Sequence, residues 1–255
     1  MTDRFISQYR SEGKRVGVLA VDPTSAFTGG SILGDRIRMS QHFTDPGVFI
    51  RSMATRGYLG GLARTTGDAV TVLDAMGFDI VIVETVGVGQ AELDVAQVAD
   101  TVVLVLTPGQ GDDVQAAKAG IMEIADIFVV NKAKREGAEG TMRNIEEILH
   151  LKPGAGEETW RPPVLRTEAI DGEGIEEVAK GIEEHRRYLA DHPETMRLRR
   201  REKARYALME ILKDKVAERF LKRTEQGEAF GAILDDIAIR KKDPYGVAET
   251  MLQDS

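Results

Sequence analysis

Short apolar runs that alternate with helical stretches are the feature of this chain that most restricts its fold. The runs are rich in valine and isoleucine and apolar on both faces, as parallel strands covered on both sides are. We predict six strands, at 15–21, 48–51, 79–84, 101–106, 126–130 and 163–167. Helical spacing is found at 2–11, 34–42, 60–76, 92–98, 112–123, 140–151 and 174–189. The sequence therefore predicts an α/β fold with a doubly wound, mostly parallel sheet.

The composition changes near residue 191, where a long charged helix begins. Apolar residues recur in it every four positions: Leu208, Leu212, Val216 and Phe220. Such a stripe favours a packing or dimerisation arm. Acidic residues interleave with the basic ones and no aromatic platform for bases is present, so RNA or a membrane is a weaker alternative. We predict two domains, 1–190 and a helical extension at 191–255 in which residues 231–252 form one or two short helices.

Composition excludes several classes of protein. The 255 residues can bury a sizeable core, and 42 acidic against 34 basic residues give a net charge of -8. General affinity for nucleic acid or anionic lipid is therefore not expected. Without cysteine there is no disulfide or thiolate metal site. No apolar run approaches the ~20 residues that span a bilayer, and we predict a cytoplasmic protein.

Two strand ends carry acidic residues and glycines. Asp22 opens an Asp-Pro-Thr-Ser turn after the first strand, and Asp35 follows in a glycine-rich segment. Glu84 ends the third strand and is followed by Gly87 within Glu-Thr-Val-Gly-Val-Gly-Gln. Carboxylates suit Mg²⁺, and glycines let backbone N–H groups approach a phosphate. An ordinary turn and a solvated strand end remain the alternatives for Asp22 and Glu84.

Two further strand ends suggest a base-binding site. Asn131-Lys132-Ala133-Lys134 resembles the guanine-specificity signature Asn-Lys-x-Asp, except that lysine stands in the fourth position. A lysine cannot accept hydrogen bonds from the guanine ring N–H and amino group. The last strand ends in Thr167, Glu168 and Ala169, where a short backbone loop could touch the base.

Five segments together resemble the methylmalonyl-CoA mutase-associated GTPases, also described as arginine/ornithine transport ATPases or kinases. They are VLAVDPTS, TGGSILGDRIRM, ETVGVGQ, TPGQGDDVQAAKAGIMEIADIFVVNK and WRPPV. The resemblance implies a P-loop NTPase-like fold and a GTP-hydrolysing chaperone. Such a chaperone gates cofactor delivery to an adenosylcobalamin-dependent acyl-CoA mutase, as a homodimer built through the helical extension.

The resemblance also implies roles for individual residues. Asp22, Asp35 and Glu84 would surround Mg²⁺ and the attacking water, and Gly87 would contact the γ-phosphate of GTP. Gln115 and Lys118 would lie in a mobile segment that senses the partner, with Lys118 helping Asp22 and Glu84 in catalysis. For Lys118, a solvated helix lysine is an equal alternative. The implied contacts to the base of GTP or GDP come from Asn131, Lys132, Thr167, Glu168 and Ala169.

The sequence departs from the family pattern in a second place besides Lys134. The family has a strand and a Gly-x-x-Gly-x-Gly-Lys-Ser/Thr loop before the helix that here begins at Thr2, and no Gly-Lys-Ser/Thr occurs in the 255 residues. That loop cradles the phosphates, so we expect no ordinary GTP hydrolysis and doubtful nucleotide binding. Without the strand, two unpaired edges are expected in the sheet. A start inside a longer protein and a degenerate relative are both open explanations.

Three other functions remain in view. A non-catalytic mutase-binding module would keep the partner-facing loops and the helical arm without turnover. A kinase that serves amino-acid transport lacks support, because no phosphoacceptor pocket is evident. A metallochaperone is weaker still, since only 4 histidines and no cysteines are present.

Overall fold

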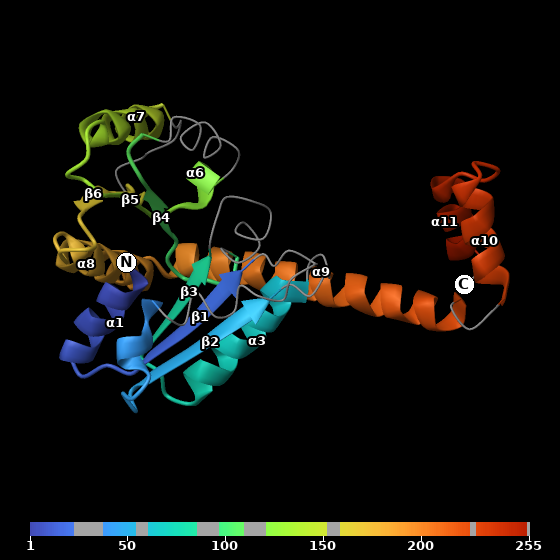
Figure 1. Cartoon of the computed structure of the whole chain (residues 1–255), viewed down its shortest axis with the longest axis horizontal. Helices are drawn as coiled ribbons and strands as arrows, with labels where there is room; N and C mark the ends of the chain where they lie inside the picture. The colour runs from blue at the N-terminus through green and yellow to red at the C-terminus, as the bar shows by residue number, and fades with distance from the viewer. Residues whose placement is uncertain are drawn as a thin grey trace. The chain divides into compact units, whose positions relative to one another are not determined.

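The computed structural model describes residues 1–22, 38–54, 61–85, 97–109, 121–151, 159–224 and 228–253 (Figure 1). The chain divides into two compact units, Met1–Tyr206 and Ala207–Ser255. The division falls inside helix α9 (Pro193–Thr224), and each unit is described by itself. The boundary after residue 190 remains a prediction.

The six predicted strands are confirmed, but they form two sheets rather than one. Their bounds are β1 Val16–Asp22, β2 Val48–Ala54, β3 Ile80–Thr85, β4 Val103–Leu106, β5 Ile127–Asn131 and β6 Val164–Thr167. The sheets have the orders β2-β1-β3 and β4-β5-β6, and every pairing is parallel. Among the described residues β3 pairs with β1 alone and β4 with β5 alone. Strands β3 and β4 therefore each have one edge without a partner among the described residues, as the family resemblance implied.

Strand β5 shows why these runs become parallel strands. Ile127 and Val129 pack against α1 and α8, while Phe128 and Val130 pack against α7 on the opposite face. All four side chains are fully buried. A strand covered on both faces has to be apolar at every position, which is the pattern visible in the sequence.

The helices complete three layers in the first unit (Figure 1). Their bounds are α1 Thr2–Ser11, α3 Gly61–Ala75, α6 Ile121–Ile124, α7 Ala138–His150 and α8 Ile175–Asp191. Helices α1 and α8 contribute to one core that contains residues of both sheets. Helix α3 packs on the other face of the first sheet and α7 on that of the second. Much of the predicted helices 34–42, 92–98 and 112–123 lies outside the described residues. Within the described part, η1 (Ser40–His42) and α6 fall in two of these ranges.

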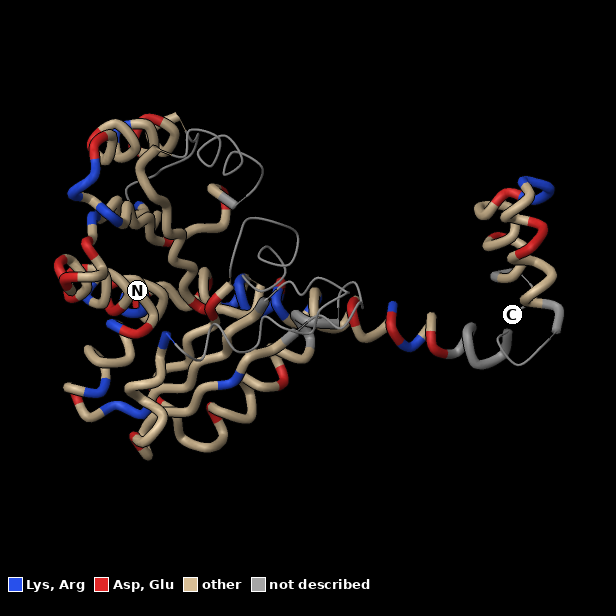
Figure 2. Tube along the Cα trace, viewed as in Figure 1, with Lys and Arg blue, Asp and Glu red and all other residues tan. Residues whose placement is uncertain are grey.

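The second unit is helical. It holds the end of α9 together with α10 (Glu228–Ala238) and α11 (Pro244–Gln253), and α11 begins at a proline, which disfavours a continuous helix with α10. Three apolar side chains of the α9 stripe are about half exposed: Leu208, Leu212 and Val216. Along α9 both basic and acidic residues occur, with three consecutive arginines at 199–201 (Figure 2). None of the described helices is long and apolar enough to cross a membrane.

Candidate functional site

Glu84 lies at the carboxyl end of β3, next to the end of β1. Its Oε1 is 3.6 Å from the guanidinium of Arg38. Its Oε2 is buried and makes no hydrogen bond within the part of the chain that the structure describes. A buried carboxylate oxygen without a partner is costly, and a bound cation would satisfy it. Glu84 therefore has the donor chemistry that Mg²⁺ requires.

The other predicted metal ligands are less fully described. Asp22 ends β1 beside β3, where Ala20 pairs with Glu84, but its side chain lies outside the description. Asp35 is outside the described residues altogether, as are Gly87, Gln115 and Lys118. Among the described residues no group of three His, Cys, Asp or Glu could hold a metal ion. The ligand set for Mg²⁺ remains a prediction.

The positive end of α1 lies near Glu84. Burial lowers the pKa of the Met1 amino group, although the neighbouring Glu84 carboxylate acts in the opposite direction. Backbone N–H groups at the start of a helix favour negative charge. The ends of β1, β3 and α1 thus combine an unsatisfied carboxylate with a positive helix end, which suits a metal ion and an anionic ligand together.

The second half of the candidate site joins the ends of β5 and β6. Asn131 Oδ1 accepts hydrogen bonds from Thr167 Oγ1 and from the Ala169 backbone N–H, each at 3.1 Å. The Ala133 N–H donates to the Thr167 carbonyl at 3.1 Å. Lys132 between them has a φ of 61°, an unusual conformation for lysine. The structure thus brings together the residues predicted to bind the base, with the Asn131 amide held at a fixed orientation.

Lys134 makes contacts that the sequence did not reveal. Its Nζ lies 2.6 Å from Asp171 Oδ2 and 2.8 Å from Glu173 Oε1, and these hydrogen bonds raise its pKa. Its backbone N–H donates to Glu168 Oε2 at 3.3 Å. Since the three acidic residues follow β6, one loop supplies every partner of Lys134 described here. The clustering of Glu168, Asp171 and Glu173 in the sequence was the available signal.

Backbone contacts hold this loop, residues 167–174, in place. Glu168 N donates to the Glu173 carbonyl at 3.0 Å, and Asp171 N donates to the Glu168 carbonyl at the same distance. From α1, Arg4 donates to the carbonyl oxygens of Ala169 and Ile170. The acidic side chains are therefore carried on a fixed loop rather than a free one.

Gly174, the N-cap residue just before α8, should be the least replaceable residue of the loop. Its φ is +77°, and a Cβ there would clash with the carbonyl oxygen of Arg166. Gly172 has a φ of +82°, but a Cβ there would meet open space. We expect Gly172→Ala to lower the unfolding free energy by about 1 kcal/mol and Gly174→Ala by about 2–3 kcal/mol, measured by urea denaturation. Equal losses would show that the clash is relieved.

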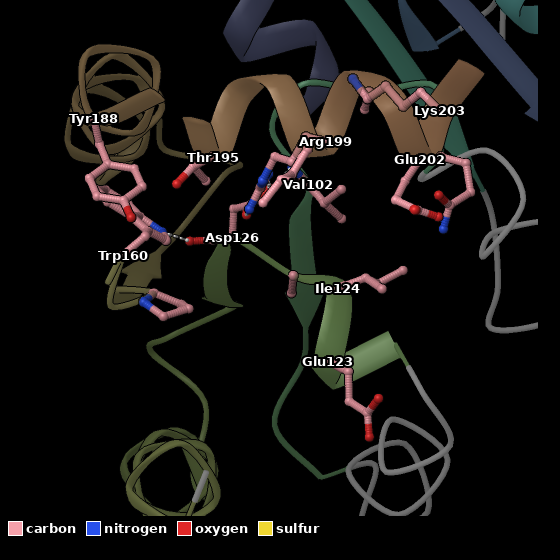
Figure 3. A pocket seen from close by; sticks show the side chains of 15 residues that line it. Val102, Glu123, Ile124, Asp126, Trp160, Tyr188, Thr195, Arg199, Glu202 and Lys203 are labelled. Carbon is pink, nitrogen blue, oxygen red and sulfur yellow. Dashed lines mark hydrogen bonds and ion pairs between the residues drawn. The ribbon is translucent and has the colours of Figure 1, made fainter. Parts of the chain in front are cut away.

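A cavity of about 540 Å³ lies at the opposite, amino ends of β4 and β5 (Figure 3). Its walls include Val102, Asp126, Trp160, Tyr188, Arg199 and Lys203. Asp126 is 3% exposed and accepts hydrogen bonds from Arg199 at 2.7 Å and from the Val102 N–H at 2.9 Å. Lys203 pairs with Asp100 at 2.7 Å. These charges are paired within the chain, and the two ion pairs hold the first part of α9 against the second sheet.

His185 lies beside Asp126 and is fully buried. Its Nδ1 is 2.8 Å from the Thr101 hydroxyl, and its Nε2 is 3.4 Å from Asp126 Oδ1. Burial lowers the pKa of His185, which favours the neutral ring near pH 7. Trp160 donates its indole N–H to the Asp126 carbonyl at 2.8 Å.

The sequence is similar to several known proteins. The family model described as "Methylmalonyl Co-A mutase-associated GTPase MeaB" matches residues 1–225. A protein of Pyrococcus abyssi named "Putative GTPase" is 49% identical over 255 residues, which cover 100% of this chain and 78% of that protein. The "Methylmalonic aciduria type A homolog, mitochondrial" of Caenorhabditis elegans is 37% identical over 247 residues, covering 95% of this chain and 61% of that protein.

Solved structures support the fold. The crystal structure of an LAO/AO transport system kinase covers 98% of this chain and 74% of its own, with a TM-score of 0.64 and 25% identity. That of HypB from Helicobacter pylori in complex with nickel covers 72% of this chain and 80% of its own, with a TM-score of 0.50 and 16% identity. The likeness to HypB concerns the fold alone.

Proposed function

The chain belongs to the methylmalonyl-CoA mutase-associated GTPase family, and we propose that it binds guanine nucleotide as the chaperone of an adenosylcobalamin-dependent acyl-CoA mutase. One observation carries the nucleotide site: Thr167 and Ala169 fix the Asn131 amide between the ends of β5 and β6. With its Oδ1 occupied by these donors, Asn131 keeps its Nδ2 hydrogens for an acceptor on the base. The Lys132 stem would pack against the ring.

The metal part of the proposal rests on Glu84 and its unsatisfied oxygen. Glu84, Asp22 and Asp35 would hold Mg²⁺, which neutralises phosphate charge and orients water in phosphoryl transfer. Gly87 would lie against the terminal phosphate, while Gln115 and Lys118 would respond to the partner.

The chaperone role would use nucleotide state to control the mutase rather than to turn over a metabolite. Family membership and the name of the Caenorhabditis elegans relative support this partner. The half-exposed stripe Leu208, Leu212 and Val216 would bury itself in a homodimer. We place the protein in the cytoplasm on its sequence.

A second candidate is a non-catalytic mutase-binding module. Lys134 in the base-reading position favours it. In that case hydrolysis would be absent while binding to the mutase persists.

Calorimetry with Mg²⁺ present tests the proposal. The titrants are GDP and a non-hydrolysable GTP analogue, with ATP as the comparison, on this chain and on any upstream extension of its reading frame. We expect Asn131→Ala to weaken GDP binding about 5- to 10-fold, because one hydrogen bond is lost. Asn144→Ala, an exposed change on α7, should leave binding unchanged. If neither guanine nucleotide binds, the non-catalytic module is the better account.

A further inference from the structure

We propose that Glu168 supplies the carboxylate that reads the guanine ring, in place of the side chain at residue 134. This inference rests on the proposed function, because it names the selectivity of the same nucleotide site. In the signature Asn-Lys-x-Asp an acid in the fourth position accepts from the ring N–H and the 2-amino group. Here that acceptor would come from the loop after β6 instead of the loop after β5.

The contact between Glu168 and residue 134 carries the argument. Glu168 Oε2 accepts the backbone N–H of Lys134 at 3.3 Å, so the carboxylate lies against the residue whose side chain would otherwise read the base. Its other oxygen, Oε1, makes no hydrogen bond with the described residues. A carboxylate has about four acceptor positions, so Glu168 keeps capacity for two donors of a ligand.

The ammonium group of Lys134 pairs with two other carboxylates and not with Glu168. Its ammonium group lies between Asp171 and Glu173, at 2.6 and 2.8 Å. An unpaired ammonium next to guanine would oppose the ring N–H and amino donors, because lysine has only donors. The two ion pairs hold Lys134 on the loop and leave the acceptor of Glu168 available.

The position of Glu168 is fixed on both sides. Its backbone N–H donates to the Glu173 carbonyl, while the next residue, Ala169, donates its own N–H to Asn131. The backbone beside Glu168 is thus hydrogen-bonded to Asn131, the residue proposed to bind the same base. A fixed acceptor costs less entropy on binding than a free side chain would.

The chemistry predicts an order of nucleotides. Guanine offers a ring N–H and a 2-amino group to one carboxylate, whereas hypoxanthine offers the ring N–H alone. Adenine and xanthine each present an acceptor at this edge, which a carboxylate repels. We therefore expect GDP to bind more tightly than IDP, and IDP more tightly than ADP or XDP.

The test compares these four diphosphates, with Mg²⁺, by ligand-detected NMR and calorimetry. Glu168→Gln, which keeps the shape but halves the acceptor capacity and adds a donor, should weaken GDP binding about 10- to 100-fold and leave ADP unchanged. Glu136→Gln, an exposed change in the loop after β5, is the matched control. Adding Lys134→Asp to Glu168→Gln should restore the preference for GDP, because it returns the acid to the fourth position of the signature.

The outcomes separate this inference from the proposed function. If Glu168→Gln binds GDP as tightly as the unaltered chain, Glu168 does not read the base, although the proposed nucleotide site stands. If none of the four nucleotides binds to the unaltered chain, the proposed function fails and this assignment fails with it. Circular dichroism of each variant checks that the fold is retained.

Discussion

Phe128→Ala should lower the free energy of unfolding by about 3–5 kcal/mol, because it removes a fully buried aromatic side chain from the centre of β5. Phe128 packs with Leu106, Val130 and Ile145 between the second sheet and α7. Those neighbours belong to strands and a helix that cannot all move inward, so a cavity should remain. For a chain of this size the loss corresponds to a fall of roughly 6–20 °C in melting temperature.

The lone tryptophan makes this prediction straightforward to measure. Trp160 belongs to the first unit and packs against His185 and Tyr188, so its fluorescence reports the unfolding of that unit in urea. Phe43→Ala is the matched control, since Phe43 is 55% exposed and its loss should change stability by about 0.5 kcal/mol or less. A similar loss for both variants would contradict the view that β5 is the centre of the core.

Local patterns were sufficient to predict most of the fold. The valine- and isoleucine-rich runs gave the six strands, because a parallel strand covered on both faces has no polar side chains to interrupt it. Helix α1 was predicted with the bounds it has, because Phe5, Ile6 and Tyr9 recur at helical spacing. In the structure these three side chains are buried. These signals lie within a few residues of one another and need no tertiary information.

Pairing between strands was harder to predict. Apolar runs indicate that a strand is covered, but not which strand lies beside it, so they predicted one sheet where the structure has two. The ends of β5 and β6 were predicted to meet, and they do, because both are carboxyl ends of neighbouring parallel strands. The predicted residues Asp35, Gly87, Gln115 and Lys118 lie outside the described part, so their roles stay predictions.

Long-range polar contacts could not be predicted at all. Lys134 was interpreted only as the loss of an acceptor, since its partners Asp171 and Glu173 are far away in the sequence. Asp126 was predicted as the first residue of a strand, but its carboxylate receives Arg199, which is 73 residues distant. No spacing rule connects such residues, because the fold alone brings them together.

Asp126→Ala should lower the free energy of unfolding of the first unit by about 3–5 kcal/mol. The side chain of Asp126 is 4% exposed and pairs with Arg199 of α9, and it also accepts the Val102 N–H that precedes β4. Its removal leaves the Val102 N–H without an acceptor and takes the charged partner from Arg199, whose side chain is 37% exposed, and each of these two losses costs about 1–3 kcal/mol.

Asp100→Ala is the control, because Asp100 precedes β4 and also forms an ion pair with α9. Asp100 pairs with Lys203 of α9, but its side chain is 82% exposed, so its removal should cost no more than about 1 kcal/mol.

Both variants should be compared at pH 7.5. Burial lowers the pKa of His185, so the stabilisation from its neutral ring is complete above the ordinary pKa of about 6.5 and is lost as the pH falls below it.

Hydrogen exchange would then show where stability is lost. If Asp126 joins α9 to the second sheet, its replacement should speed amide exchange in the first turns of α9 and in β4, while α3 on the first sheet keeps its protection. Asp100→Ala should change exchange little. If α3 lost as much protection from amide exchange as α9, Asp126 would support the core as a whole. Helix α9 would then be held to the sheet by its apolar contacts.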